Sequence, residues 1–247
     1  MKLSEITTHL DRLLRIGEIK DYPNALNGLQ VANDGNVTKI AAAVDACEAV
    51  ITEAVESGAD LLIVHHGLFW SGLEPVTGAA YRKLALCLKN NLAIYSAHLP
   101  LDEHSQYGNN ALLCDALGLP AERHPFLTSG FAADFVIERA ELVERLTAAV
   151  GGGRVHIAPG GPAETKRIGV LSGGAGGAIA KAASEGVDTF ITGEGPHWSY
   201  TAAEELGVNL LYAGHYATET FGVKALSAHL RSVYTLPWHF IDHPTGL

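Results

Sequence analysis

Two adjacent histidines end a short apolar run in the first third of the chain. Residues 61–64 are Leu-Leu-Ile-Val, and His65, His66 and Gly67 follow them. This pattern predicts a buried strand of an α/β sheet, where ligands gather at the carboxyl ends of the strands. Because consecutive strand residues point to opposite faces, both imidazoles can serve one centre only if the backbone turns sharply or if two metal ions share the pair. The alternative is a hydrogen-bonded histidine pair that only ends the strand.

Two further histidines each precede a carboxylate by four residues, in the pairs His98–Asp102 and His215–Glu219. On a helix this spacing would place both groups on one face, but Pro100 favours a strand-to-helix loop for the first pair. Nitrogen and oxygen ligands without a thiolate suit Zn²⁺, Mn²⁺, Fe²⁺ or Co²⁺. They are about enough for two divalent ions bridged by a carboxylate and a water. The alternative is that the two carboxylates only cap helices.

The periodicity of apolar residues predicts the elements that carry these groups. Around the histidines, strands are expected over 38–44, 61–66 and 92–97, and helices over 3–16, 47–57, 80–90 and 107–117. Residues 21–31 form a loop rich in Pro, Asn and Gly. A later strand at 131–137 and a helix at 140–149 precede a glycine turn at 151–153. The fold class is therefore α/β.

An internal repeat divides the chain. Residues 39–70 align without a gap on residues 167–198, and 91–98 match 208–215 in pattern. Such copies predict two related α/β lobes, 1–118 and 167–247, joined by a connecting segment at 119–166 within one compact unit. The second copy has Glu194 between two glycines where the first has His66. Glu194 is therefore expected beside the metals, as an outer-shell group or general base, or else as a solvated loop carboxylate.

Composition excludes several classes of protein. With 17 basic and 27 acidic residues the net charge is −10, which opposes a general nucleic-acid or anionic-membrane surface. No apolar run approaches the roughly 20 residues of a membrane span, and the first residues lack the apolar centre of a signal peptide. The three scattered cysteines are expected to be reduced core residues of a cytoplasmic protein.

Several motifs in this order resemble the Nif-three-like dinuclear-metal family, whose bacterial members are often labelled GTP cyclohydrolase 1 type 2 homologues. They are Asn-Gly-Leu-Gln-Val at 27–31, Val-His-His-Gly-Leu-Phe-Trp at 64–70, Ala-His-Leu-Pro-Leu-Asp at 97–102, Phe-Ile-Thr-Gly-Glu at 190–194 and Ala-Gly-His-Tyr-Ala-Thr-Glu at 213–219. The resemblance implies two α/β lobes around a central di-metal site, assembled into a toroidal homohexamer. It also implies the metal ligands His65, His66, Asp102, His215 and Glu219, with His98 in a near-shell role.

Two hypotheses about function follow. The first is a metal-dependent hydrolase that uses a metal-bridging water on a nucleotide or another small phosphorylated or cyclic substrate; the family label points to opening of the guanine ring of GTP. The second is a non-catalytic metal-binding or scaffold protein with protein or nucleic-acid partners. The glycine-rich stretch 172–177 could hold a phosphate, although a tight turn is favoured. Expected substrate contacts are His104, Tyr107 and His197.

Overall fold

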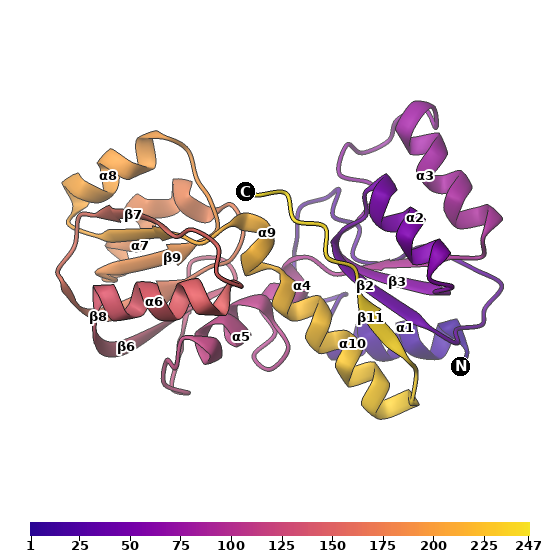
Figure 1. Ribbon diagram of the computed structural model, residues 1–247, viewed down its shortest axis with the longest axis horizontal. Helices are drawn as coiled ribbons and strands as arrows, with labels where there is room; N and C mark the ends of the chain where they lie inside the picture. Colours follow the sequence, from indigo (N-terminus) through magenta and orange to yellow (C-terminus); the bar gives the residue numbers. More distant parts are fainter. The chain divides into compact units, whose positions relative to one another are not determined.

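The computed structural model describes residues 1–247 as a mixed α/β chain with two sheets (Figure 1). The chain divides into two compact units. Unit 1 comprises Met1–Leu101 and Gly222–His243, and unit 2 comprises Asp102–Phe221 and Pro244–Leu247. Residues 119–166, expected to connect two lobes, form three strands and a helix of unit 2, and the chain returns to unit 1 near its end.

The sheet of unit 1 has five strands in the order β1-β4-β3-β2-β11. The four strands from β4 to β11 run parallel, and β1 pairs antiparallel with β4 at the edge. Parallel sheets are covered on both faces, so their strands can be apolar throughout; all six residues of β3 except His66 are buried. The strand bounds are β1 Gly28–Val31, β2 Ile40–Asp45, β3 Leu61–His66, β4 Ala93–Ser96 and β11 Trp238–Phe240.

Helices cover both faces of this sheet (Figure 1). One face packs against α2 (Glu48–Glu56) and α3 (Gly78–Lys89) in a single apolar cluster. On the other face lie α1 (Leu3–Leu13) and α10 (Thr220–Tyr234), which are joined by the hydrogen bond between His9 Nε2 and His229 Nε2 at 2.9 Å. Because helices cover both faces, a site of this unit is expected at the edge formed by the carboxyl ends of the parallel strands.

The sheet of unit 2 has six strands in the order β5-β6-β8-β9-β10-β7. Its centre, β8-β9-β10, is parallel, while β5, β6 and β7 add antiparallel pairs on either side. The strand bounds are β5 His124–Phe126, β6 Gly130–Glu138, β7 His156–Pro159, β8 Glu164–Val170, β9 Thr189–Thr192 and β10 Asn209–Tyr212.

Two apolar clusters hold the helices of unit 2 on its sheet. One face packs against α5 (Asn109–Ala116) and α6 (Arg139–Ala149). The other packs against α7 (Ile179–Ser184), which follows the short 3₁₀ turn η1 (Ala175–Ala178), and α8 (Trp198–Leu206). Two one-turn helices, α4 (Leu99–Asp102) and α9 (His215–Thr218), follow strands β4 and β10 in the chain.

In each unit an aspartate makes the same hydrogen bonds to backbone N–H groups where the parallel strands begin. In unit 1, Asp60 Oδ2 accepts hydrogen bonds from the backbone N–H groups of Thr38 and Lys39 at 2.6 and 3.0 Å. In unit 2, Asp188 Oδ2 accepts from those of residues 166 and 167 at 2.8 and 3.2 Å. Both aspartates stand two residues after a glycine with positive φ. In each unit the carboxylate therefore ties the beginning of its own strand to the beginning of the neighbouring parallel strand.

The elements predicted from periodicity are confirmed to within a few residues at each end, from α1 to α6. The sequence did not predict β1 inside the expected loop 21–31, nor the three-residue strands β5 and β11, because edge strands this short depend on their pairing partner. Cys87 and Cys114 are buried free thiols, and burial raises their pKa values to about 11 and about 12. No helix of the chain has the length and apolar character that crossing a bilayer requires.

Candidate metal centre

The two histidines predicted at a strand end lie at the carboxyl end of β3, and each is held through Nδ1. His65 Nδ1 donates to the carbonyl oxygen of Ala97, after β4, at 2.8 Å. His66 Nδ1 donates to Asp45 Oδ1, at the end of β2, at 2.8 Å. Because these oxygens only accept, Nδ1 carries the hydrogen and Nε2 carries the lone pair that can bind a metal.

These contacts explain how neighbouring strand residues reach one cluster. His65 is held on the β4 side of β3 and His66 on the β2 side, and their ring centroids lie 4.8 Å apart. His98, after β4, joins them: one ligand atom from each of the three histidines lies within 4.8 Å of the other two. The structure therefore places His98, expected near the ligands, inside the histidine cluster.

The third imidazole is held by a carboxylate that sequence analysis missed. Asp21 accepts from His98 Nδ1, with its two oxygens at 2.9 and 3.1 Å, and from the N–H of Leu99 at 2.9 Å. Burial raises the pKa of Asp21, but hydrogen bonds from His98 and Asn27 outweigh it and lower the pKa to about 2. Asp21 is therefore ionised throughout the neutral range and fixes the ring of His98.

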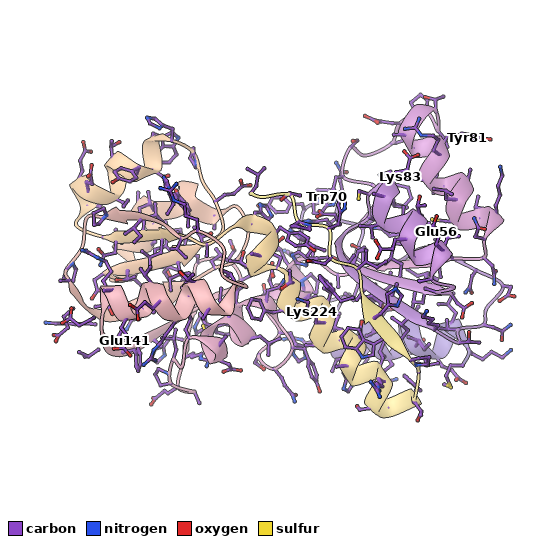
Figure 2. All side chains as sticks on the ribbon, viewed as in Figure 1. Glu56, Trp70, Tyr81, Lys83, Glu141 and Lys224 are labelled. Atoms are coloured by element: carbon purple, nitrogen blue, oxygen red, sulfur yellow. The ribbon has the colours of Figure 1, made fainter.

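The loop after β3 and a side chain from β1 also shape this cluster. Trp70, labelled in Figure 2, turns its ring edge-on to His98 with centroids 4.9 Å apart. Gly67 leaves room for Gln30, whose amide atoms would lie 2.3–2.6 Å from a Cβ at that position. Gln30 Oε1 in turn accepts from the N–H of Leu68 at 2.7 Å. The loop after β3 is thus fixed by a side chain from β1.

In unit 2 the candidate ligands lie at the one-turn helix α9, which follows β10. His215 Nε2 lies 3.2 Å from Glu219 Oε2, and His215 Nδ1 donates to Glu194 Oε1 at 2.8 Å. Burial of His215 lowers its pKa, but the hydrogen bonds and charges of Glu219 and Glu194 outweigh this and raise it to about 9. Glu219 is itself only 3% exposed. Glu194 thus contacts the Nδ1 side of a candidate ligand.

The glycine-rich loop after β8 packs against these ligands. A Cβ on Gly173 would lie 2.3 Å from Glu219 Oε1 and 3.3 Å from His215 Nε2, and its φ of +72° is itself a conformation that favours glycine. Gly174 lies against His215 and Glu194. The stretch 172–177 is therefore a close backbone wall of this cluster. The stretch continues through η1 into the six-residue helix α7.

Asp102, the remaining predicted ligand, is 4% exposed at the end of α4. Its Oδ1 accepts from Asn109 Nδ2 at 2.9 Å and from Ser172 Oγ at 3.3 Å. Ser172 immediately precedes Gly173, so the glycine-rich loop contacts both Asp102 and Glu219. These contacts orient the carboxylate.

The donor sets of both clusters fit a transition-metal ion. The cluster of unit 1 consists of imidazoles whose Nδ1 is bonded to an oxygen, and unit 2 adds a fourth such imidazole and two buried carboxylates; neither set contains a thiolate. This is the arrangement in which histidine ligands of metals are usually found. Residues His65, His66, His98, His215 and Glu219 are those that could hold metal in these clusters.

The expected substrate contacts lie in different places. His104 Nδ1 accepts from the N–H of Tyr107 at 3.1 Å, and their rings stack at 5.1 Å, so this pair shapes the turn before α5. His197, at the start of α8, lines a hollow of unit 2 together with Tyr200 and Tyr212. Sequence analysis missed these two tyrosines and also Asp21 and Asp45; only Asp45, at the end of a predicted strand, carried a signal that could have found it.

The fold and the clusters define a class: a mixed α/β chain with histidine and carboxylate groups at the carboxyl ends of its strands. A family model described as Duf34/NIF3 (NGG1p interacting factor 3) matches residues 1–245, and the chain belongs to this family.

Similar proteins support this assignment along the whole chain. A GTP cyclohydrolase 1 type 2 homolog of Deinococcus radiodurans is 41% identical and covers 98% of the chain and 94% of its own length. A GTP cyclohydrolase 1 type 2 homolog of Halobacterium salinarum is 42% identical, and the match covers 100% of the chain and 100% of that relative. Among solved structures, TTHA1606 from Thermus thermophilus superposes with a TM-score of 0.93 at 40% identity over both complete chains. Reduced HcgD from Methanocaldococcus jannaschii superposes with a TM-score of 0.88 at 28% sequence identity, over 98% of each chain.

Proposed function

We propose that this protein binds two divalent transition-metal ions, Zn, Fe, Mn or Co, and uses them to hydrolyse a nucleotide or another small phosphorylated or cyclic substrate. The proposed ligands are His65, His66, Asp102, His215 and Glu219, with His98 and Glu194 next to them. Membership of the Duf34/NIF3 family and the name of its relatives, GTP cyclohydrolase 1 type 2 homolog, support this proposal.

One observation carries the proposal. All four imidazoles of the clusters bond through Nδ1 to an oxygen: the Ala97 carbonyl for His65, Asp45 for His66, Asp21 for His98 and Glu194 for His215. A histidine that only caps a strand needs no such partner on a fixed ring nitrogen. Four rings with the same nitrogen occupied favour metal binding through Nε2.

The chain's own groups have defined parts in this chemistry. When bound, the two ions supply Lewis-acid stabilisation of charge that develops on oxygen in hydrolysis, and they make water more acidic. Glu194 accepts a hydrogen bond from His215 Nδ1 and so orients the ring, which leaves Nε2 as the atom that would bind metal. Asp21 and Asp45 do the same for His98 and His66. The buried carboxylates Asp102 and Glu219 offset the positive charge of bound ions.

We further infer that the two units derive from one repeated unit. The matching aspartates Asp60 and Asp188, each at the start of a parallel strand, support the repeat. The resemblance of the whole chain to dinuclear-metal proteins supports two ions per chain. By the same resemblance we propose a homo-oligomer, a toroidal hexamer.

The test is the metal content of each purified chain, paired with a screen of nucleotide, phosphoester and cyclic amide hydrolysis. Both are measured before chelation, after it and after metal is added back. Variants His66→Ala and Glu219→Gln each remove one proposed ligand, one from each unit. His124→Ala removes an exposed histidine of β5 and serves as the matched control.

We expect about two ions per wild-type chain and chelator-sensitive turnover of one substrate class. Both should be lost in the ligand variants and retained in His124→Ala. Two ions without turnover of any substrate would contradict the hydrolase and favour a non-catalytic metal-binding protein. Turnover that persists in a verified metal-free chain would contradict a metal-dependent mechanism.

A further inference from the structure

A hollow of about 460 Å³ lies on unit 2, in the size range of small-molecule sites. Six residues line it, and five of them carry rings: His156, Gly195, Pro196, His197, Tyr200 and Tyr212. None of them is a lysine or arginine, so the lining offers stacking surfaces and hydrogen bonds rather than a site for a phosphate group.

The rings come from three elements that the fold brings together. His156 on β7 and Tyr212 on β10 are directly paired in the antiparallel register, so their side chains share one face of the sheet. His197 immediately precedes α8, and Tyr200 lies in its first turn. Residues three apart at the start of a helix face the same side. The ring surfaces are therefore presented from a strand pair and from a helix end.

The ring of Tyr212 is held rigidly. Ser199 Oγ donates to the carbonyl oxygen of Pro196, so the hydroxyl of Tyr212 donates to Ser199 Oγ in turn. Cβ atoms on Gly176 and Gly195 would lie 2.4 and 2.5 Å from this hydroxyl oxygen, which only glycine permits at both positions. With its hydroxyl enclosed, Tyr212 presents ring surface to the hollow. Such a wall needs little ordering when a ligand binds.

Backbone segments connect the hollow with the candidate metal ligands of unit 2. Gly195 directly follows Glu194, which holds His215. The glycine-rich loop borders both places: Gly174 lies against His215 and Glu194, and Gly176 lies against Tyr212 and Gly195. One glycine-rich stretch thus extends from the metal ligands to Tyr212 and Gly195, which line the hollow.

We propose that this hollow binds a planar heterocyclic ring, such as a nucleobase, as the part of the substrate that positions it for the metal ligands. The proposal rests on the proposed hydrolase function for its purpose, but the ring-binding site stands on its own geometry. Aromatic and imidazole rings stack on planar bases, whatever the base, because each presents a π-face. The Ser172–Gly177 loop then borders this site through Gly176, which lies against Tyr212 and Gly195.

The experiment measures binding of guanosine to the full, metal-loaded chain by equilibrium dialysis, with ribose as the probe that lacks a planar ring. Three variants are compared with wild type. His197→Ala removes an exposed ring and Tyr200→Ala removes a half-buried one. Tyr200→Phe keeps the ring and removes only its hydroxyl. Tyr81→Ala removes an exposed tyrosine of α3, labelled in Figure 2, and is the matched control.

We expect guanosine to bind and ribose not to bind. Each alanine variant in the hollow should weaken guanosine binding about tenfold, while Tyr200→Phe and Tyr81→Ala stay within about twofold and all variants keep their metal. Equal binding of guanosine and ribose, or unchanged affinity in both His197→Ala and Tyr200→Ala, would overturn the proposal. Ring-dependent guanosine binding by a chain that hydrolyses nothing would support the hollow and reject only the hydrolase.

Discussion

The two units use a similar parallel framework but hold different donors. At the strand ends of unit 1, three imidazoles gather, anchored by Asp21, Asp45 and a backbone carbonyl. Unit 2 contributes one imidazole among carboxylates, backed by a glycine-rich loop. Unit 1 thus supplies nitrogen and unit 2 mainly oxygen. The two units thus combine similar parallel strands with different candidate donor atoms at the strand ends.

The largest effect is expected where the glycine wall of unit 2 contacts its ligands. Gly173→Ala adds a methyl group 2.3 Å from Glu219 Oε1 at a φ of +72°. We expect loss of metal, and destabilisation by about 1–3 kcal/mol from the collision beyond about 1–2 kcal/mol from backbone strain. Urea denaturation in chelator and metal analysis measure both.

Gly151→Ala is the matched control for this change. Its φ is +78°, but no atom lies within 4 Å of the added Cβ, so it has the strain without the collision. We expect it to keep its metal. If both variants lost the same stability and both kept metal, the glycine wall would not shape the site.

The next effect concerns the carboxylates that anchor the histidines of unit 1. Asp45→Ala removes the acceptor of His66 Nδ1 but leaves every proposed ligand in the sequence. We expect metal affinity to fall about 10–100-fold, measured by competition with a chromogenic chelator. Asp134→Ala, which removes an exposed carboxylate, is the control and should leave the affinity unchanged. Equal affinities in the two variants would show that Asp45 has no role in metal binding.

The smallest effect is the pH dependence of the metal-free chain. The pKa of His215 is raised from 6.5 to about 9, so its contact with the carboxylates stabilises the fold fully below pH 6.5, and this contribution is lost as the pH rises through about 9. In chelator, the melting temperature of wild type should exceed that of His215→Gln at pH 6, and the difference should shrink by pH 9.5. A difference that is constant or grows with pH would contradict this ion-pair account.

The sequence predicted the parts of the site that depend on local pattern. The apolar run that ends in His65 and His66 predicted the end of strand β3. The four-residue spacing of the two histidine–carboxylate pairs left helix and loop open, and Pro100 favoured a loop for the first pair. The structure instead has the one-turn helices α4 and α9 there, since proline is tolerated in the first turn of a helix. Asp21 could not be predicted, because it lies in a loop without periodicity and meets His98 only through the fold.

The hollow of unit 2 shows the same limit. His156 and Tyr212 become neighbours through pairing of β7 with β10, and β7 is a four-residue edge strand that no local pattern indicated. The glycine-rich loop was visible in the sequence, but its role was not, since the positive φ of Gly173 and its contact with Glu219 depend on the fold.

Anomalous diffraction from crystals of the metal-loaded protein, recorded on either side of the metal's absorption edge, tests the central claim most directly. We predict two anomalous peaks per chain at the proposed ligands, with each histidine bound through Nε2 while its Nδ1 keeps its oxygen partner. A single peak, ions bound through Nδ1, or ions bound only outside the two clusters would contradict it.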